Sequence, residues 1–166
     1  MSTTEDESAG LSEYDLGLAR KRMASGVLFF DLDGRVLLVD PVYKQQWEVP
    51  GGAVESDESP RDGAIREVKE ELGLVCVPGR LLCVDWVAPR PERSEGLNTL
   101  FDGGVLPEDQ VAAIQLQEEE LRAFAFIPLD EVGQRLTPQL ARRVLAAAAA
   151  RERGETVWLE NGHLVD

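Results

Sequence analysis

Apolar residues along this chain gather in short runs separated by turn-forming residues, a pattern typical of strands. The runs 23–30 and 36–39 flank Asp31-Leu32-Asp33-Gly34 and predict two strands joined by a tight turn. Residues 156–165, centred on Asn161-Gly162, predict a hairpin. Further strands are predicted at 47–55 (where proline and two glycines interrupt the run), 81–87, 99–106 and 121–127.

Helical patterns occupy three segments. The clearest covers 59–72, because Ser59 suits the N-cap, Pro60 suits the first helical position and Gly73 suits the end. A short helix is expected at 129–136 and a longer one from Thr137 to about residue 153. In the first helix, an apolar stripe at i, i+3 and i+7 consists of Ile65, Val68 and Leu72.

These elements predict the fold class. Short strands around a few helices, in mixed order, indicate an α+β or layered α/β/α domain. The chain has 166 residues, the length of one domain. We expect residues 20–166 to form that domain and residues 1–19, which are polar, acidic and aperiodic, to be a flexible tail.

Charge and composition exclude several function classes. Seventeen basic and 31 acidic residues give a net charge of −14, which repels nucleic acid polymers and anionic lipid. The single histidine, His163, and two cysteines, Cys76 and Cys83, supply too few ligands for a zinc site. We expect both cysteines to be packing residues. Neither a membrane-length apolar run nor a basic leader is found, so the cytoplasm is the expected location.

Three carboxylates on the first helix are candidates for chemistry. Glu67, Glu70 and Glu71 lie at i, i+3 and i+4, which places them on one helix face within about one turn. Clustered carboxylates repel one another unless a cation lies among them, and hard oxygen ligands suit Mg²⁺ or Mn²⁺. On these residues alone, a solvated acidic face is the alternative.

The surrounding sequence resembles a known family. From Gly52 to Leu74 it reads Gly, five residues, Glu, seven residues, then Arg-Glu-Val-Lys-Glu-Glu-Leu-Gly-Leu, which is similar to the complete Nudix box of the Nudix hydrolases. Trp47-x-x-Pro-Gly-Gly before it and Pro128-Leu129-Asp130-Glu131 late in the chain also resemble that family. The resemblance implies a Nudix-type α/β/α sandwich with a mixed central β-sheet.

The resemblance also implies site residues. Glu67, Glu70 and Glu71 match the family's metal-binding glutamates, and Gly51 matches a residue that gives a backbone carbonyl to the metal. Arg66, with Glu70 and Glu71, is placed in the predicted catalytic set, where it orients a carboxylate. For the further glutamate that members often use as ligand or general base, the candidates are Glu118, Glu119 and Glu120, of which Glu120 is preferred; a solvated acidic run is the alternative.

The implied activity is divalent-metal-dependent hydrolysis of the diphosphate linkage in a nucleoside diphosphate derivative, such as a nucleotide sugar, an ADP-ribose type compound or a nucleoside triphosphate. The alternative is a Nudix-fold module that senses a nucleotide without cleaving it. A homodimer is a further implication. Pro89, fifteen residues past the box, resembles a proline of members acting on ADP-ribose.

Substrate contacts are left open at this point. Candidates for base stacking are Tyr43, Trp47, Trp86 and Phe101, with packing as the alternative role. Candidates for contacts to a substrate phosphate are the basic trio Arg20, Lys21 and Arg22 and the loop arginines Arg90 and Arg93, with solvated side chains as the alternative.

Overall fold

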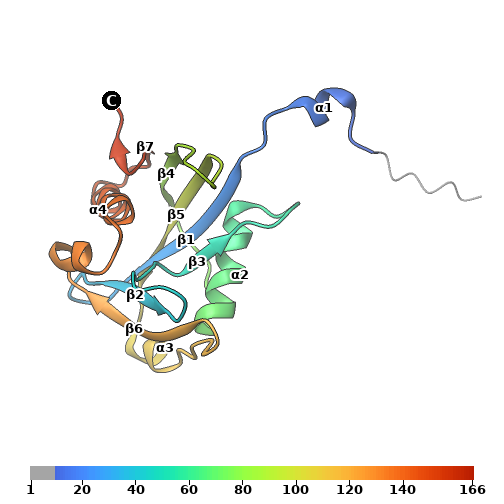
Figure 1. Ribbon diagram of the computed structural model, residues 1–166. Coiled ribbons are helices and arrows are strands. Elements are labelled where there is room, and N and C mark those ends of the chain that lie inside the picture. The colour runs from blue at the N-terminus through green and yellow to red at the C-terminus, as the bar shows by residue number, and fades with distance from the viewer. Residues whose placement is uncertain (1–9) are drawn as a thin grey trace, which may run out of the picture.

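The computed structural model describes residues 10–166, which fold around one eight-stranded sheet (Figure 1). The strands follow the order β6-β2-β1-β5-β4-β7-β8, and β3 pairs with β1 beside that path. In chain order the elements are α1 (Glu13–Gly17), β1 (Arg22–Phe30), β2 (Val36–Pro41), β3 (Gly51–Ala53), α2 (Pro60–Leu72), β4 (Leu81–Val87), β5 (Gly96–Val105), α3 (Glu108–Ala112), β6 (Leu121–Ile127), the 3₁₀ helix η1 (Leu129–Gln134), α4 (Pro138–Arg153), β7 (Val157–Glu160) and β8 (His163–Leu164).

Both faces of the central strand are buried, because its successive side chains enter two different cores. Val27 and Phe29 pack in the core under α2, whereas Leu28 and Phe30 pack in the core under α4. Alternation with period two on a strand covered on both sides produces this division. A continuous apolar run at 27–30 is therefore one strand that supplies two layers.

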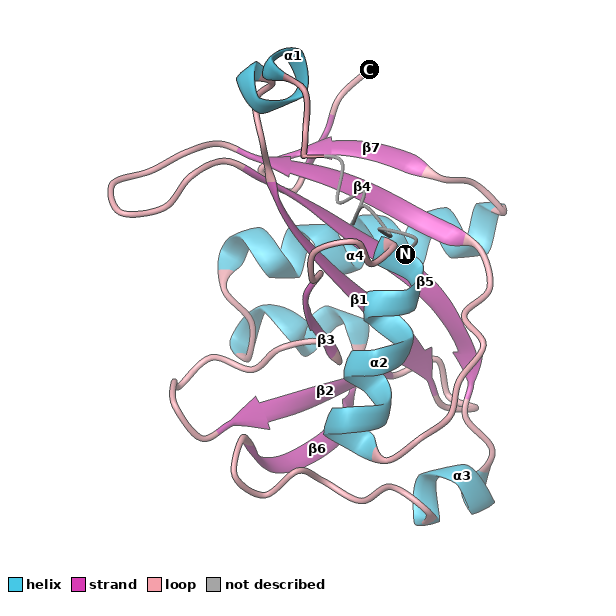
Figure 2. Cartoon of the chain, turned by 90° about the vertical axis from the view of Figure 1, so that its right-hand side faces the viewer, coloured by secondary structure: helices cyan, strands magenta, loops and turns pink. Residues whose placement is uncertain are grey.

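Helices cover the two faces of the sheet. Figure 1 shows α2 on one side of the strands and α4 on the other, and Figure 2 shows α2 crossing in front of the sheet. Val132 of η1 packs in the core with α4, and Val111 of α3 packs against the core with α2. These layers confirm the predicted α/β/α sandwich.

The sheet is mixed, as the resemblance implied. β1 runs parallel to β5 and antiparallel to both β2 and β3. Ser25 is the partner of Thr99 on β5, and its neighbour Gly26 is the partner of Gly51 on β3. The middle of β1 therefore brings β3, and with it the box segment, beside the centre of the sheet.

Several elements differ from the predictions. The helix α1 lies inside the predicted tail 1–19, of which residues 1–9 are outside the described residues. Helix α3 was not predicted, and the predicted helix 129–136 is a 3₁₀ helix. The predicted strand 47–55 is reduced to β3, because Pro50 has no N–H to donate to a ladder and Gly51 has a φ of 151°. β5 begins at Gly96, three residues before its predicted start.

Both cysteines are free thiols, and only one is fully buried. Cys83 lies inside β4 with no exposed surface, and burial raises its pKa to about 12. Cys76 is half-buried in the loop after α2, where it packs against the core under that helix. Across residues 10–166, none of the helices combines the length and apolar character that a membrane span requires.

Candidate active site

Helix α2, which carries the box glutamates, begins and ends at the predicted residues. The Oγ of Ser59 accepts a hydrogen bond from the N–H of Asp62 at 3.0 Å, and Gly73 ends the helix with a φ of 68°. Its buried apolar residues are Ala64, Val68 and Leu72. Ile65 is only half-buried, which corrects the predicted stripe: the small side chain of Ala64 lets the helix lie close to the sheet with residue 64 facing inward.

The three glutamates of α2 lie in three different environments. Glu71 is only 8% exposed, Glu67 is half-buried, and the side chain of Glu70 is 51% exposed. A uniformly solvated acidic face, the alternative to a metal site, is therefore wrong for Glu71. Its Oε2 accepts a hydrogen bond from the backbone N–H of Gly51 at 3.0 Å.

Glycines allow β3 to approach both β1 and α2 closely. A Cβ on Gly51 would lie 2.3 Å from the carbonyl oxygen of Ser25, and one on Gly52 would lie 2.6 Å from the Cδ of Glu67. Neither position can hold a side chain without a shift of its neighbours. The Pro-Gly-Gly sequence thus fixes the backbone of residue 51 directly against the carboxylate of Glu71.

Arg66 joins the box residues into one network. Its Nε donates to Oε1 of Glu58 at 2.8 Å, its Nη1 donates to Oε1 of Glu67 at 2.9 Å, and its Nη2 donates to the carbonyl of Ala53 at 3.0 Å. A weaker contact of 3.3 Å joins Nη1 to Glu70. The hydrogen bonds from Arg66 lower the pKa of Glu58. Since Arg66 is not among the residues that line the neighbouring cavity, its place in the network is that of a positioning residue.

Burial and like charges combine at Glu71. Burial is the main reason that its pKa rises to about 8, and the charges of Glu67, Glu120 and Glu48 raise it further against the opposing hydrogen bond from Gly51. Burial also raises the pKa of Glu67, with added contributions from Glu70 and Glu120. The acidic side chains therefore interact electrostatically across three segments: α2, the segment before β3 and the segment before β6.

The structure distinguishes among the three glutamates proposed outside the box. Glu120 lines the cavity beside Glu71, and its carbonyl accepts the N–H of Val42 at 2.8 Å. All three side chains are exposed, but Glu118 and Glu119 do not line the cavity. Glu120 comes immediately before β6, and because β6 pairs with β2, it lies next to β2.

Sequence reasoning missed Glu48 as a member of this group. It lines the same cavity, bridges to Val39 of β2 and pairs with Lys44. Within the chain it stands between Trp47 and Val49 in a segment that was interpreted only as a strand. Because successive side chains of a strand point to opposite faces, residue 48 faces away from the side that residues 47 and 49 face. That alternation is the signal that could have identified Glu48.

The residues present fit a divalent cation, although no three His, Cys, Asp or Glu side chains within residues 10–166 stand close enough to enclose one. Arg66 pairs with Glu67 and Glu70, and Lys44 pairs with Glu48. Glu71 has a single N–H donor and three repelling carboxylates around it. A cation bound by oxygen ligands would relieve that repulsion, and hard carboxylate and carbonyl oxygens suit Mg²⁺ or Mn²⁺.

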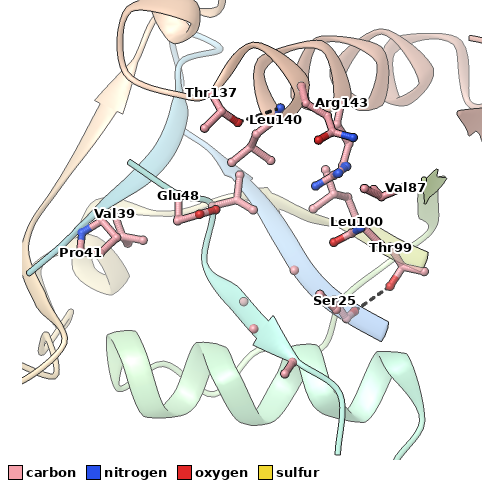
Figure 3. Close-up of a pocket in the computed structure, with 18 of the residues that line it drawn as sticks. Ser25, Val39, Pro41, Glu48, Val87, Thr99, Leu100, Thr137, Leu140 and Arg143 are labelled. Atoms are coloured by element: carbon pink, nitrogen blue, oxygen red, sulfur yellow. Dashed lines mark hydrogen bonds between the residues drawn. The ribbon is translucent and has the colours of Figure 1, made fainter. Parts of the chain in front are cut away.

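A cavity of about 880 Å³ extends along the sheet (Figure 3), and it is lined by Glu48, Glu71 and Glu120 but not by Glu67 or Glu70. The hydroxyl of Thr99 donates to the hydroxyl of Ser25 at 2.9 Å on its floor. Arg143 extends from α4 toward Leu100 and is neutralised by buried Asp85 at 2.7 Å. The cavity therefore has carboxylates at one end and a polar floor beside them.

Of the four aromatic candidates for stacking, only Tyr43 lines the cavity, with 72% of its surface exposed. Trp47 packs against the core with α4, and the guanidinium of Arg135 lies 4.7 Å from the centre of its ring. Trp86 donates to Glu95, and Phe101 is buried in the core under α2.

Comparisons with known proteins agree with this geometry. The family model described as the NUDIX domain matches residues 20–148. A MutT-like protein of Streptomyces ambofaciens is 30% identical over 115 residues, which cover 69% of each chain. The mouse diphosphoinositol polyphosphate phosphohydrolase 2 is 43% identical over 70 residues, and the match spans 42% of this chain but only 39% of that protein.

Solved structures share the fold. The crystal structure of an ADP-ribose pyrophosphatase from Streptococcus suis aligns with a TM-score of 0.59 and 24% identity, covering 84% of this chain and 99% of that one. At that identity the likeness speaks for the fold alone. The family model matches most of the chain, and the complete motif from Gly52 to Leu74 is present on α2 and the segment before it. This chain therefore belongs to the Nudix family.

Proposed function

We propose that this chain is a divalent-metal-dependent hydrolase of the diphosphate linkage in nucleoside diphosphate derivatives. The observation that carries the proposal is the convergence of Glu71, Glu120 and Gly51 at one end of the large cavity. Carboxylates that repel one another in the free protein are a suitable site for a cation and for the phosphates it bridges. Phosphoryl transfer depends mainly on positioning and charge neutralisation, and this arrangement supplies both.

The proposed metal ligands come from the family resemblance, and the positions of Glu71, Gly51 and Glu120 at the cavity support them. Glu67, Glu70, Glu71 and the carbonyl of Gly51 would hold Mg²⁺ or Mn²⁺, which, when bound, neutralises phosphate charge and lowers the pKa of a bound water. Glu120, on the cavity wall, would accept the proton of the attacking water as its oxygen bonds to phosphorus and the bridging oxygen leaves. Arg66 would hold Glu67 in place from outside the cavity.

The substrate class is proposed from the cavity and the relatives together. One relative bears the name of a diphosphoinositol polyphosphate phosphohydrolase and one structural neighbour that of an ADP-ribose pyrophosphatase, so substrates in the family vary around a diphosphate. We favour a nucleotide sugar, an ADP-ribose type compound or a nucleoside triphosphate, with Tyr43 available to stack on the base. From the family resemblance we also propose a homodimer located in the cytoplasm, and sedimentation of the purified chain tests the dimer.

The test of the activity is product formation with Mg²⁺ on ADP-ribose, nucleotide sugars, dinucleoside polyphosphates and nucleoside triphosphates. The wild type should turn over one class, and Glu71→Gln should lose that turnover because the buried carboxylate is removed. Glu152→Gln, an equal change on an exposed side chain of α4, is the matched control and should retain full activity.

Binding without turnover separates the hydrolase from a nucleotide-sensing module. If one compound raises the melting temperature of the wild type but is never cleaved, the sensing function replaces the proposal. If turnover is equal in the wild type and Glu71→Gln, the metal site proposed on α2 is wrong.

A further inference from the structure

Three arginines gather at the end of the cavity that lies away from the carboxylates. Arg22 begins β1, and Arg90 and Arg93 flank the tip of the hairpin between β4 and β5. All three line the same cavity as Glu71 and Glu120. Positive charges grouped in one place need an explanation in a chain whose net charge is −14.

The backbone holds the three arginines together. Arg90 and Arg93 exchange backbone hydrogen bonds of 3.0 Å in each direction, and residues directly opposite in an antiparallel pair project their side chains to the same face. The Nε and Nη2 of Arg22 donate to the carbonyl of Ser94 at 3.1 and 2.6 Å, which fastens its guanidinium to that hairpin. Burial and the neighbouring charges of Arg93 and Arg90 lower the pKa of Arg22.

Within residues 10–166, no carboxylate lies within 4.0 Å of any of these three guanidinium groups. Glu92, at the tip of the hairpin between Arg90 and Arg93, forms no ion pair with these arginines within the same residues. The next acidic residue, Glu95, is engaged by Lys21 at 2.6 Å and by the indole N–H of Trp86 at 2.7 Å. Arg143, in the same cavity, does have an acidic partner in Asp85. Like charges held directly opposite on a hairpin are unfavourable unless an anion lies between them.

The register of β1 sets the separation between the two ends of the cavity. Gly26 is the partner of Gly51, whose N–H contacts Glu71, and Arg22 lies four residues earlier on the same strand. At 3.3 Å per residue, the backbone positions are about 13 Å apart. Carboxylates suited to a metal and its diphosphate therefore stand at one end, and three guanidinium groups with no carboxylate partner among residues 10–166 stand at the other.

We propose that Arg22, Arg90 and Arg93 form a second anion subsite, which holds a phosphate monoester of the substrate at a distance from the diphosphate that is cleaved. This inference rests on the proposed hydrolase function and narrows its substrate class to compounds that carry a further phosphate. Guanidinium groups bind phosphate oxygens through paired hydrogen bonds, and a monoester with nearly two negative charges matches three arginines better than a carboxylate does.

Matched ligands that differ by one phosphate test the subsite. ADP-ribose is compared with 2′-phospho-ADP-ribose, and 3′-dephospho-coenzyme A with coenzyme A, by calorimetric titration in EDTA, where binding is measured without turnover. We expect the wild type to bind the phosphorylated member at least about tenfold more tightly in one pair, and the preference to shrink as salt is added.

Arg90→Gln/Arg93→Gln should reduce that preference to less than about twofold. Both side chains are exposed and make no side-chain hydrogen bond within the described residues, so the variant should keep the melting temperature of the wild type. Arg35→Gln/Arg153→Gln removes the same charge from exposed positions outside the cavity and should leave the preference unchanged.

Equal binding of both members of each pair by the wild type would overturn the subsite, as would a preference that survives in Arg90→Gln/Arg93→Gln or no binding of any of the four compounds. Turnover with Mg²⁺ is measured separately on the same compounds. Cleavage without a preference leaves the hydrolase standing and removes the subsite, whereas preferential binding without cleavage of any substrate leaves the subsite standing and removes the hydrolase.

Discussion

At the scale of single residues, the carboxylate of Glu71 lies in an arrangement that is unfavourable without a cation. It is buried, accepts one backbone hydrogen bond from Gly51, and is repelled by Glu67, Glu120 and Glu48. Its neighbours on α2 are relieved in another way, because the guanidinium of Arg66 reaches both Glu67 and Glu70. Glu71 is therefore the residue whose replacement separates metal binding from folding.

Replacing Glu71 with glutamine should stabilise the metal-free protein, with a clear dependence on pH. The pKa of Glu71 is about 8 in the folded state against an ordinary value of 4.5, so the folded protein binds this proton more tightly than the unfolded chain. Stability therefore falls as pH rises from about 4.5 through 8. Glutamine does not titrate and keeps an oxygen for the N–H of Gly51, so in EDTA we expect a gain on the order of a few kcal/mol at about pH 9 and none near pH 4.

Urea unfolding of both proteins across that pH range measures the difference. Glu152→Gln serves as the control and should follow the wild type throughout, because its side chain is 80% exposed. A Glu71→Gln protein no more stable than the wild type at about pH 9 would show that burial and the neighbouring charges do not disfavour the ionised carboxylate.

A second expectation concerns the pair formed by Arg66 and Glu58. Two hydrogen bonds, of 2.8 and 3.1 Å, join the guanidinium to the carboxylate, and lysine cannot reproduce both. Arg66→Lys and Glu58→Gln should each destabilise the fold, and a double-mutant cycle on the free energy of unfolding should give a coupling of about 0.5–3 kcal/mol. Because Arg66 also holds Glu67, Arg66→Lys alone should weaken the apparent affinity for Mg²⁺ beyond the effect of Glu58→Gln. Additive single effects would contradict a direct pair.

At this scale, prediction from sequence succeeds where local structure alone sets the position of a side chain. The helix that carries the box carboxylates was predicted correctly, and the role of these carboxylates as metal ligands stays a prediction. Glu48 was missed: strand alternation separates it from Trp47 and Val49, but only the fold brings its charge near Glu71. The arginines 22, 90 and 93 were named separately, but only the pairing of β1 with β5 places them together.

At the scale of elements, the contact between β3 and α2 shapes the site. Gly52→Ala should cost more activity than stability, because its Cβ would lie 2.6 Å from the carboxyl carbon of Glu67 and push that carboxylate from its place. We expect turnover to fall at least about tenfold, the change that a loss of 1.4 kcal/mol in transition-state stabilisation produces. Gly133→Ala on η1, where an added Cβ meets nothing within 4 Å, is the matched control. Equal turnover in the two variants would mean that the close approach has no catalytic role.

Elements with strong local signals were predicted nearly to the residue. Helices α2 and α4 each follow a capping hydroxyl, begin with a proline and end before a glycine with positive φ, so local chemistry alone sets their ends. The elements α1 and α3 have five residues each, too few for a helical period to show. The 3₁₀ character of η1 depends on how the chain turns after β6 and has no pattern of its own in the sequence.

At the scale of the whole molecule, the cavity is assembled from parts that are distant in the chain. Its walls come from β1, β2, β3, β5, the segment before β3, the hairpin after β4, the start of β6 and the first turns of α4, and Glu71 reaches it from α2. Sequence patterns predicted most of these elements, but the order of the strands was not among the predictions. The parallel pairing of β1 with β5 joins the two ends of the site, and β1 is buried on both faces, as is usual for strands in parallel pairs.

Substitutions at two adjacent residues of α2 should show that the stability of the fold comes from its apolar cores and not from the metal. Leu72 has no exposed surface and packs in the core under α2, whereas Glu71 faces the cavity. Leu72→Ala should lower the free energy of unfolding by about 2–5 kcal/mol through the cavity it leaves. Glu71→Gln should not lower it.

The response to Mg²⁺ should be lost in the stable variant, Glu71→Gln, and kept in the destabilised one, Leu72→Ala. A ligand at about a hundred times its Kd stabilises a protein by about 2.7 kcal/mol, so Mg²⁺ should raise the melting temperature of the wild type and, by a similar free energy, of Leu72→Ala. In Glu71→Gln the effect of Mg²⁺ should disappear.

Circular dichroism in EDTA should show the wild type still folded, because both cores are built from apolar side chains without any metal ligand. Loss of the folded spectrum on chelation would instead make the metal part of the fold and would remove the separation between core and site on which the proposed function depends.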